Sequence, residues 1–266
     1  TFVANKMRYT PFPAELFKKN RAKLYAQLPP KSIVVVSSND IMPTNADGTM
    51  GFRQNSDLFY LSGLDQEETY LILYPDAPEP QWKEIAFVRE TSELIEIWEG
   101  HKYTKEEATQ TSGIENIQWS SNFESLLKTL VYSANHIYLT DNEHLRNASV
   151  VQTQNARLGI NIRNTYPNHA IGRLAPILSD LRMQKEPEEL QALQMACDIT
   201  EKGFRRVLNF TKPGVTEYEI EAEFIHEFTR NRSEGFAYSP IIASGSNACV
   251  LHYINNALPC KNGDML

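Results

Sequence analysis

The sequence predicts an α/β fold in the first part of the chain and a strongly helical start to the second part, for three reasons. Short runs rich in β-branched residues alternate with helical or loop segments, as in sheets covered by helices. Near residues 172–176 this alternation stops, and apolar residues then recur at helical spacing. The 266 residues, 41% of them hydrophobic, suffice for two domains. We therefore expect domains over residues 1–174 and 175–266.

The first domain is expected to open with an amphipathic helix over residues 13–28. Leu16, Leu24 and Leu28 lie near helical spacing in this segment, and Pro29-Pro30 ends it. Four β-branched or apolar runs then predict buried strands, at residues 32–38, 69–74, 84–88 and 136–140.

Two helices are expected between these strands. Thr104 and Glu107 have the spacing of a capping box, in which each side chain binds the backbone N–H of the other residue at a helix start. Residues 121–132 form the second predicted helix.

The second domain is predicted to begin with two helices. Pro187 occupies a first-turn position, and apolar residues follow at three- or four-residue steps as far as Leu208. Thr216 and Glu219 form another capping-box pattern, which predicts the next helix. Short strands joined by turns are expected over residues 240–266. The apolar residues Met265 and Leu266 predict the start of a strand where the sequence stops, so we expect a longer polypeptide.

Composition excludes several classes of function. The formal net charge of -7, with 33 acidic and 26 basic residues, would repel a phosphate backbone, so no nucleic-acid partner is expected. No apolar run is long enough to span a membrane, and residues 1–9 lack the pattern of a signal peptide. The three cysteines fit neither a disulfide framework nor a zinc site. We expect free thiols and a cytoplasmic protein.

The residues alone do not single out an active site. Glu223 and His226 have the spacing of half a di-metal site, but no second copy exists, so a solvated helix face is the better interpretation. His252 lies between apolar neighbours and, taken alone, is compatible with an ordinary core or surface histidine. Phosphate loops, nucleophile elbows and dinucleotide fingerprints are not found in the sequence.

A family resemblance goes further, and it begins at residues 51–65. This run, with Arg-Gln-Asn-Ser-Asp at 53–57, closely resembles the signature of the creatinase-like N-terminal domain of Xaa-Pro aminopeptidases and prolidases. Its polar side chains are of the kind that cap turns and helix starts, so we expect a structural role for them. Residues 95–102, which include Trp98, resemble a tryptophan-containing stretch of aminopeptidase P.

The resemblance continues into the second domain. Residues 181–190 are similar to the helix that opens the pitta-bread metallopeptidase domain, and residues 236–245 and 250–253 resemble its first catalytic strands. The implied fold is a creatinase-like α/β domain followed by the first part of a pitta-bread α+β catalytic domain. The implied activity of the complete protein is metal-dependent hydrolysis of the Xaa-Pro bond at peptide N-termini.

The resemblance also implies roles for particular residues. The histidine that matches His252 lies beside the metal centre and hydrogen-bonds substrate, and the tyrosine that matches Tyr238 lines the same pocket. The tryptophan that matches Trp98 lines a neighbouring subunit's pocket in tetrameric relatives, although an ordinary packed aromatic is the alternative for Trp98. The expected substrates are peptides with proline at the second position, and the expected assembly is a homo-oligomer, dimer or tetramer.

The family uses two divalent metal ions, for which manganese is the expected identity. Its metal-binding aspartates, histidine and glutamates have no counterpart in this sequence, so we expect the ligands beyond Leu266 and no hydrolysis by this chain alone. Two other functions remain open. A prolidase would cleave only Xaa-Pro dipeptides, and a non-catalytic member of the fold would bind peptides or proteins.

Overall fold

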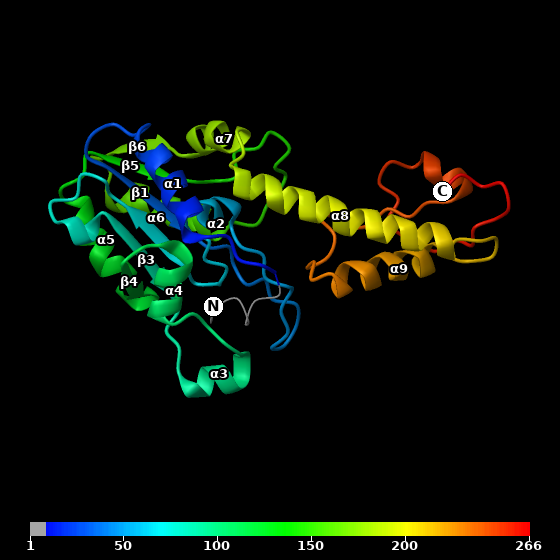
Figure 1. The fold of residues 1–266 in the computed structure, drawn as a ribbon. Coiled ribbons are helices and arrows are strands. Elements are labelled where there is room, and N and C mark those ends of the chain that lie inside the picture. Colours follow the sequence, from blue (N-terminus) through cyan, green and yellow to red (C-terminus); the bar gives the residue numbers. More distant parts are fainter. Residues whose placement is uncertain (1–8) are drawn as a thin grey trace. The chain divides into compact units, whose positions relative to one another are not determined.

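The computed structural model describes residues 9–266, which divide into two compact units. The N-terminal unit comprises Pro11–Lys185, and the C-terminal unit comprises Glu186–Leu266 together with Tyr9 and Thr10. Helix α7 (Ala175–Met183), which follows the boundary expected near Leu174, contacts the first helix of the N-terminal unit. Figure 1 traces the chain through both units.

A six-stranded mixed sheet forms the centre of the N-terminal unit, in the order β4-β3-β2-β1-β5-β6 (Figure 1). β1 pairs antiparallel with β2 and parallel with β5. The remaining pairs are antiparallel for β2 with β3, and parallel for β3 with β4 and for β5 with β6. The strands are β1 (Ser32–Ser37), β2 (Tyr70–Leu73), β3 (Glu84–Val88), β4 (Asn116–Trp119), β5 (His136–Leu139) and β6 (Ala170–Arg173).

Helices cover both faces of this sheet. In β1, Ile33 and Val35 pack into a cluster with apolar side chains of α5 (Phe123–Val131) and α6 (Gln154–Thr165). Val34 and Val36 are equally buried and point to the opposite face, because successive side chains of a strand alternate. That face is covered by contacting helices, α1 (Ala14–Tyr25), α2 (Ser56–Ser62) and α4 (Lys105–Ser112).

One buried arginine joins the helices of this face. Arg21 of α1 has no exposed surface, and its Nη1 donates to the carbonyl oxygens of Leu61 (2.8 Å) and Ser112 (3.0 Å). These carbonyls lie at the C-terminal ends of α2 and α4, where a cation is favourable. Arg21 also pairs with Glu84 at 3.0 Å.

The signature segment has the structural role expected for it. Asn55 is the N-cap of α2, and its Oδ1 accepts hydrogen bonds from two backbone N–H groups of that helix. Gln54 donates to the carbonyl oxygens of Leu64 and Gln66. Asp57 accepts from Thr140 Oγ1 (2.8 Å) and Arg182 Nη1 (2.7 Å), which ties α2 to the end of β5 and to α7.

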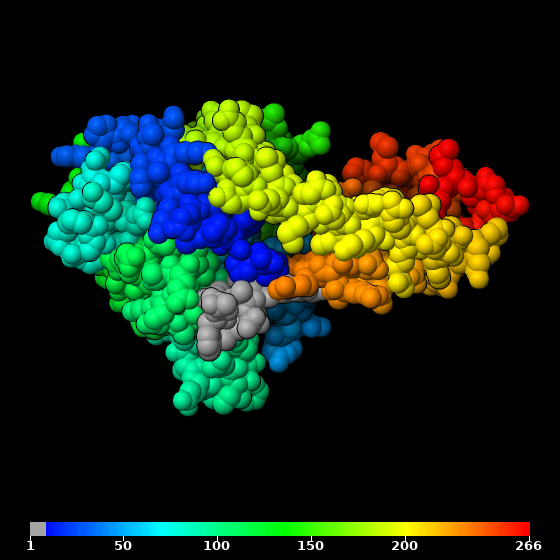
Figure 2. Space-filling model, in the orientation of Figure 1, coloured from blue at the N-terminus to red at the C-terminus, as the bar shows by residue number. Residues whose placement is uncertain are grey.

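Several short elements complete the N-terminal unit. Thr104 and Glu107 form the predicted capping box at the start of α4. Helix α3 (Glu93–Glu99) has no buried residue and stands away from the sheet (Figures 1 and 2). Two 3-10 turns, η2 (Pro80–Trp82) and η3 (Ser120–Asn122), flank strands β3 and β4.

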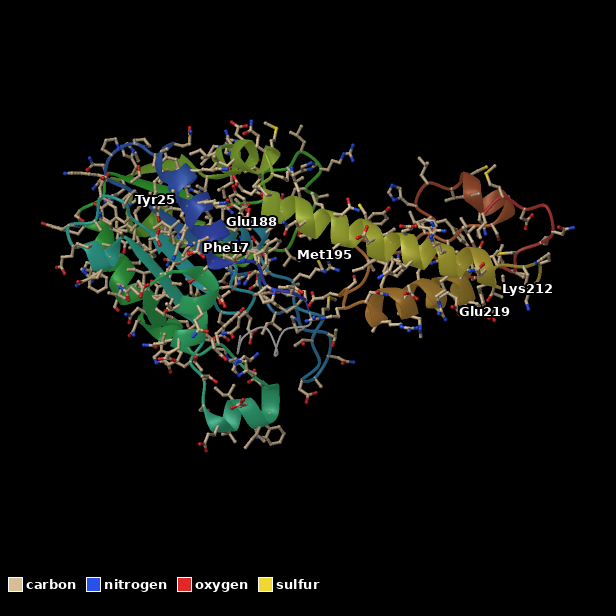
Figure 3. All side chains as sticks on the ribbon, viewed as in Figure 1. Phe17, Tyr25, Glu188, Met195, Lys212 and Glu219 are labelled. Atoms are coloured by element: carbon tan, nitrogen blue, oxygen red, sulfur yellow. The ribbon has the colours of Figure 1, made fainter. Side chains whose placement is uncertain are left out.

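The C-terminal unit is built on two packed helices, α8 (Pro187–Phe210) and α9 (Glu217–Arg230). Pro187 is the first residue of α8, as predicted, and Thr216 donates to the Glu219 carboxylate at the start of α9. Figure 3 labels Glu219 in this first turn. Gly203 lets the helices approach, because a Cβ there would lie 2.9 Å from the Phe224 ring. The core consists of Val207, Val215, Ile220, Phe224, Phe228 and Cys260.

The strands expected over residues 240–266 are not present in the described structure. This segment contains one 3-10 turn, η4 (Gly245–Cys249), and a single bridge between Thr216 and Pro259. A strand needs a neighbouring backbone to complete its ladder. Here several backbone N–H groups donate to side chains instead, including those of Ile242, Ser244 and Leu258.

Two further observations bear on the class of protein. Cys197, Cys249 and Cys260 are free, as predicted. None of the helices described between residues 9 and 266 combines the length and apolar character that a bilayer crossing requires.

Candidate functional site

Tyr238 and His252 both lie in the irregular segment that follows α9, residues 231–266. Tyr238 is 75% exposed, and His252 is exposed in a turn closed by a hydrogen bond from Tyr253 N–H to the Val250 carbonyl (3.3 Å). Among residues 9–266, no hydrogen bond or ion pair engages the side chain of either residue. Both side chains are therefore available to a ligand, and their positions depend on neighbouring residues.

The main anchor of this segment is Glu217, the first residue of α9, which has no exposed surface. Its Oε1 accepts from the backbone N–H (2.7 Å) and hydroxyl (2.8 Å) of Ser244, with Asn247 Nδ2 at 3.4 Å. Its Oε2 accepts from the Tyr253 hydroxyl (2.7 Å) and the Leu258 N–H (2.9 Å). One carboxylate thus fixes three parts of the segment.

These contacts determine the ionisation of Glu217. Burial by itself would raise the pKa of this carboxyl, but the hydrogen bonds from Leu258, Tyr253 and Ser244 lower the pKa to about 2. Glu217 is therefore an anion at neutral pH, and its charge is compensated by donors from the segment that it holds.

Asn256 is a second anchor. It is 2% exposed and adopts a left-handed backbone conformation (φ 46°), which asparagine tolerates better than most residues. Its Nδ2 donates to Glu221 Oε2 (2.7 Å) and to the Pro240 carbonyl (3.1 Å), and its Oδ1 accepts from Ile242 N–H (3.0 Å). Asn256 thus connects the end of the segment with the residues that follow Tyr238.

Sequence reasoning did not identify either anchor. In the sequence, Glu217 is an acidic residue in the first turn of a predicted helix, where acidic residues are common because they interact favourably with the helix dipole. Asn256 is one of two adjacent asparagines in a predicted loop. Neither position carries a spacing pattern that would distinguish it.

The described residues do not provide a metal site. Among residues 9–266, no group of three or more His, Cys, Asp or Glu side chains is placed to hold a metal ion. The carboxylate of Glu223 instead forms an ion pair with Arg206, whose guanidinium also lies 3.9 Å from Glu227. This arrangement supports the interpretation of Glu223 and His226 as part of a solvated helix face.

Trp98 belongs to the N-terminal unit, on helix α3. It is 80% exposed, and its apolar neighbours Leu94 and Ile97 are 65% and 79% exposed. Trp98 is therefore not an ordinary packed aromatic in the described structure. The helix presents an apolar surface made of these three side chains.

A network of ion pairs holds the end of α3. Arg89 donates to both carboxylate oxygens of Glu99 (2.5 and 2.8 Å) and to Glu67 (3.1 Å), and Lys102 donates to Glu67 (2.5 Å). The hydrogen bond from Arg89 lowers the pKa of Glu99. Burial opposes ionisation of Glu67, but the contacts with Lys102 and Arg89 lower its pKa overall. A cavity of about 350 Å³ lies beside this network and is lined by residues that include Arg89 and Ile95.

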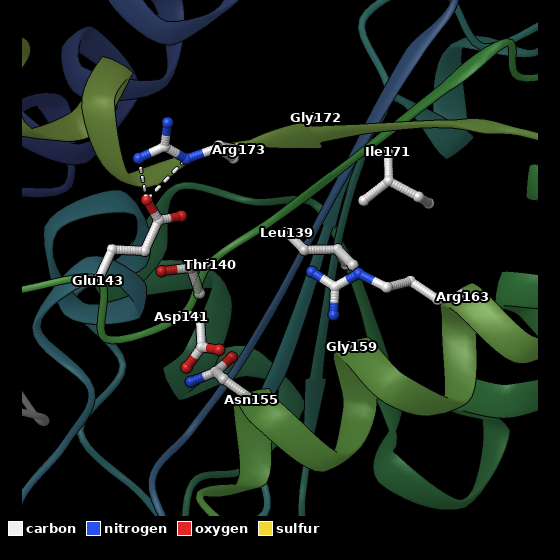
Figure 4. Close-up of a pocket in the computed structure, with 10 residues that line it drawn as sticks. All are labelled: Leu139, Thr140, Asp141, Glu143, Asn155, Gly159, Arg163, Ile171, Gly172 and Arg173. Carbon is white, nitrogen blue, oxygen red and sulfur yellow. Dashed lines mark hydrogen bonds and ion pairs between the residues drawn. The ribbon is translucent and has the colours of Figure 1, made fainter. Parts of the chain in front are cut away.

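A second cavity lies in the N-terminal unit beyond the ends of β5 and β6 (Figure 4). It has a volume of about 210 Å³ and a lining of both charge signs, including Asp141, Glu143, Arg163 and Arg173. Arg173 donates to Glu143, with its Nε at 2.7 Å. None of the residues singled out from the sequence lines this cavity.

Comparison with known proteins finds two family models in the chain. Residues 17–138 match the aminopeptidase P N-terminal domain, and residues 191–266 match metallopeptidase family M24. These matches confirm the predicted resemblance and the predicted order of the two domains.

Curated proteins similar to this chain include Xaa-Pro aminopeptidases. A Xaa-Pro aminopeptidase of Haemophilus influenzae is 31% identical over 254 residues, which are 96% of this chain and 56% of the relative. A Xaa-Pro aminopeptidase of Escherichia coli is 28% identical, with 94% of this chain and 57% of the relative covered. The chain spans about half the length of the curated relatives it matches.

Solved structures agree with these matches. An aminopeptidase P structure from Bacillus anthracis has a TM-score of 0.87 and 28% identity, and the match covers 95% of this chain and 60% of that one. The aminopeptidase PepP of Pseudomonas aeruginosa has a TM-score of 0.84 and 26% identity, covering 96% and 57%. Aminopeptidase P from E. coli, with a TM-score of 0.80 and 25% identity over 96% of this chain and 58% of that one, has been solved with the inhibitor Pro-Leu.

Proposed function

We propose, from the premise that this chain belongs to the M24 metallopeptidases that carry an aminopeptidase P N-terminal domain, that the complete protein is a metal-dependent aminopeptidase. It would release the first residue of peptides that have proline at the second position. The observation that carries this proposal is the succession of both domains in one chain, 96% of which aligns with a Xaa-Pro aminopeptidase.

The M24 family implies divalent metal cofactors, and we include in the proposal that the ions are two and are manganese. Residues 9–266 supply no ligand set for them. The roles proposed for the residues of this chain are therefore to bind and orient the peptide.

We assign His252 to the substrate. Its imidazole has no polar partner in the described structure, so a ring nitrogen is available to hydrogen-bond the peptide or the developing oxyanion. Removing one such donor typically lowers the rate on the order of 100-fold or more.

Tyr238 would form a wall of the pocket that receives proline. The proline ring has no backbone N–H to bind, so its recognition depends on shape and apolar contact. The exposed ring of Tyr238 offers such a surface.

Trp98 would complete the pocket of a neighbouring subunit in a homo-oligomer, dimer or tetramer. Two features of α3 support this role. Its apolar side chains are exposed together, which is typical of interaction sites, and ion pairs fix its end. We place the protein in the cytoplasm and expect no nucleic-acid partner, in line with its net charge of -7.

The test is hydrolysis of Arg-Pro-Pro by the complete protein and by this 266-residue chain, each with manganese and with a chelator. We expect arginine release by the complete protein, loss of that release with chelator, and no release by the shorter chain. Arg-Ala-Pro is the matched control and should not be cleaved.

Two outcomes would contradict this proposal. Cleavage of Arg-Pro but not of Arg-Pro-Pro would identify a prolidase. An inert complete protein, tested with several divalent metals, would favour a non-catalytic protein that binds peptides.

A further inference from the structure

The segment that carries His252 is organised around a single buried anion. The donors to Glu217 come from Ser244, Tyr253 and Leu258, which lie before, next to and after His252 in the sequence. His252 itself is exposed and has no polar partner among the described residues. Its location is therefore set by its neighbours, and the nearest of these contacts is the Tyr253 hydroxyl.

Only a carboxylate of this length satisfies all of these donors. Both oxygens of Glu217 are engaged, each by at least two strong donors. A glutamine would direct an NH2 group at one of these pairs, and the backbone N–H of Ser244 or Leu258 cannot reverse its role to accept. An aspartate is shorter by one methylene and would not reach both sets of donors.

The interaction works in both directions. A buried carboxylate is tolerated only where donors compensate its charge, and here the donors belong to an irregular segment that has one isolated bridge and no strand. The anion thus stabilises the segment, and the segment stabilises the anion. The lowered pKa of Glu217, about 2, is consistent with this mutual dependence.

We infer that Glu217 is a positioning residue, which through the Tyr253 hydroxyl fixes the location of His252 for substrate binding. The role of His252 in substrate binding rests on the proposed function. The fixing of His252 by Glu217 rests only on the contacts described above. Glu217 contacts no substrate in this scheme and acts only through the segment.

The key variant is Tyr253→Phe, which removes one donor and keeps the ring. Tyr218→Phe is the matched control, because Tyr218 lies next to Glu217 on α9, is 56% exposed and makes no hydrogen bond in the described structure. Glu217→Gln is the stronger variant, and Tyr253→Phe keeps the test valid if Glu217→Gln does not fold.

The first measurement is NMR relaxation of the His252 backbone and imidazole in the 266-residue chain. We expect Tyr253→Phe to increase the mobility of His252 relative to the wild-type chain and to Tyr218→Phe. Unchanged mobility of His252 in Tyr253→Phe would overturn the inference, whether or not the complete protein is a peptidase.

The second measurement is kcat/KM for Arg-Pro-Pro in the complete protein. We expect Tyr253→Phe to lower kcat/KM roughly 10-fold, since a displacement of about 1 Å at a reacting group can cost on the order of 100-fold. In the His252→Ala background, Tyr253→Phe should have no further effect, because it acts through the imidazole.

Each remaining outcome is decisive for one of the two proposals. Independent, multiplying effects of Tyr253→Phe and His252→Ala would overturn the positioning role and leave the peptidase proposal intact. If His252→Ala leaves kcat/KM unchanged, or the complete protein is inert, the proposed role of His252 is wrong and the NMR result alone decides whether Glu217 fixes it.

Discussion

The sheet of the N-terminal unit and the segment after α9 in the C-terminal unit are held in place by different forces. Strand β1 is buried along its whole length; Ile33 and Val35 enter an apolar cluster on one face, and Val34 and Val36 are buried on the other. The segment over residues 240–258 exposes Val250 and Leu251, and apart from Ile242, which packs against the core, its side-chain anchors are the polar groups of Glu217 and Asn256. Apolar packing distributes stability over many contacts, whereas the polar anchors concentrate it in a few.

The largest effect is expected from the apolar region. Phe87 is fully buried in the cluster that joins the sheet to α5, so Phe87→Ala should destabilise the N-terminal unit by about 4 kcal/mol. Urea unfolding followed by hydrogen exchange would measure this loss. Leu94→Ala, at an exposed position of α3, is the control and should have little effect. Equal losses in both variants would contradict the assigned core.

Removal of the buried carboxylate should have the next largest effect. Glu217→Ala leaves the backbone N–H groups of Ser244 and Leu258 without their acceptor and should cost roughly 3 kcal/mol. Hydrogen exchange of residues 244–258 would detect the change, while β1 should keep its protection. A loss confined to β1 would refute the assignment of Glu217 as the anchor.

The stabilising effect of the Glu217 carboxylate should depend on pH. The pKa of Glu217 is lowered from 4.5 to about 2, so its stabilising effect is complete above pH 4.5 and is lost as the pH falls toward 2. The difference in stability between the wild-type chain and Glu217→Ala should therefore narrow over this interval. Urea unfolding of both proteins at pH 6, 4 and 2.5 would show it. A constant difference would mean that these contacts do not lower the pKa of Glu217.

The smallest effect on stability is expected at the base of α3. Arg89→Ala removes the hydrogen bonds to Glu99 and Glu67 in a partly exposed network, so the unfolding midpoint should barely move. The amides of α3 should nevertheless exchange faster. Arg173→Ala, which breaks another arginine–glutamate pair in the same unit, is the control and should leave α3 unchanged.

The two regions also differ in how far the sequence predicts them. β1, β2, β3 and β5 were predicted because their apolar runs are buried. The edge strands β4 and β6 were missed: only Ile117 is buried in the first, and no residue is buried in the second. The apolar pairs at Ile241 and Val250 suggested strands in the C-terminal unit, and this prediction was wrong because strand pairing is a long-range property that a short run does not contain.

The candidate site also contains residues that the sequence points to and residues that it does not. Tyr238 and His252 were named from a family resemblance, and their roles stay predictions. Glu217 and Asn256 became apparent only from the folded chain, because their partners lie up to 41 residues away and have no fixed spacing from them. Buried polar contacts of this kind depend on the tertiary structure and leave no periodic pattern in the sequence.

The burial of Arg21 constrains the order in which parts of this protein can fold during synthesis. Helix α1 is synthesised before α2 and α4, and the carbonyl groups that Arg21 binds come 40 and 91 residues later. A nascent chain that ends before Ser112 has nowhere to bury this guanidinium completely, because the end of α4 does not yet exist. Helix α1 must therefore wait, solvated or loosely attached, until Ser112, 91 residues after Arg21, has left the ribosome.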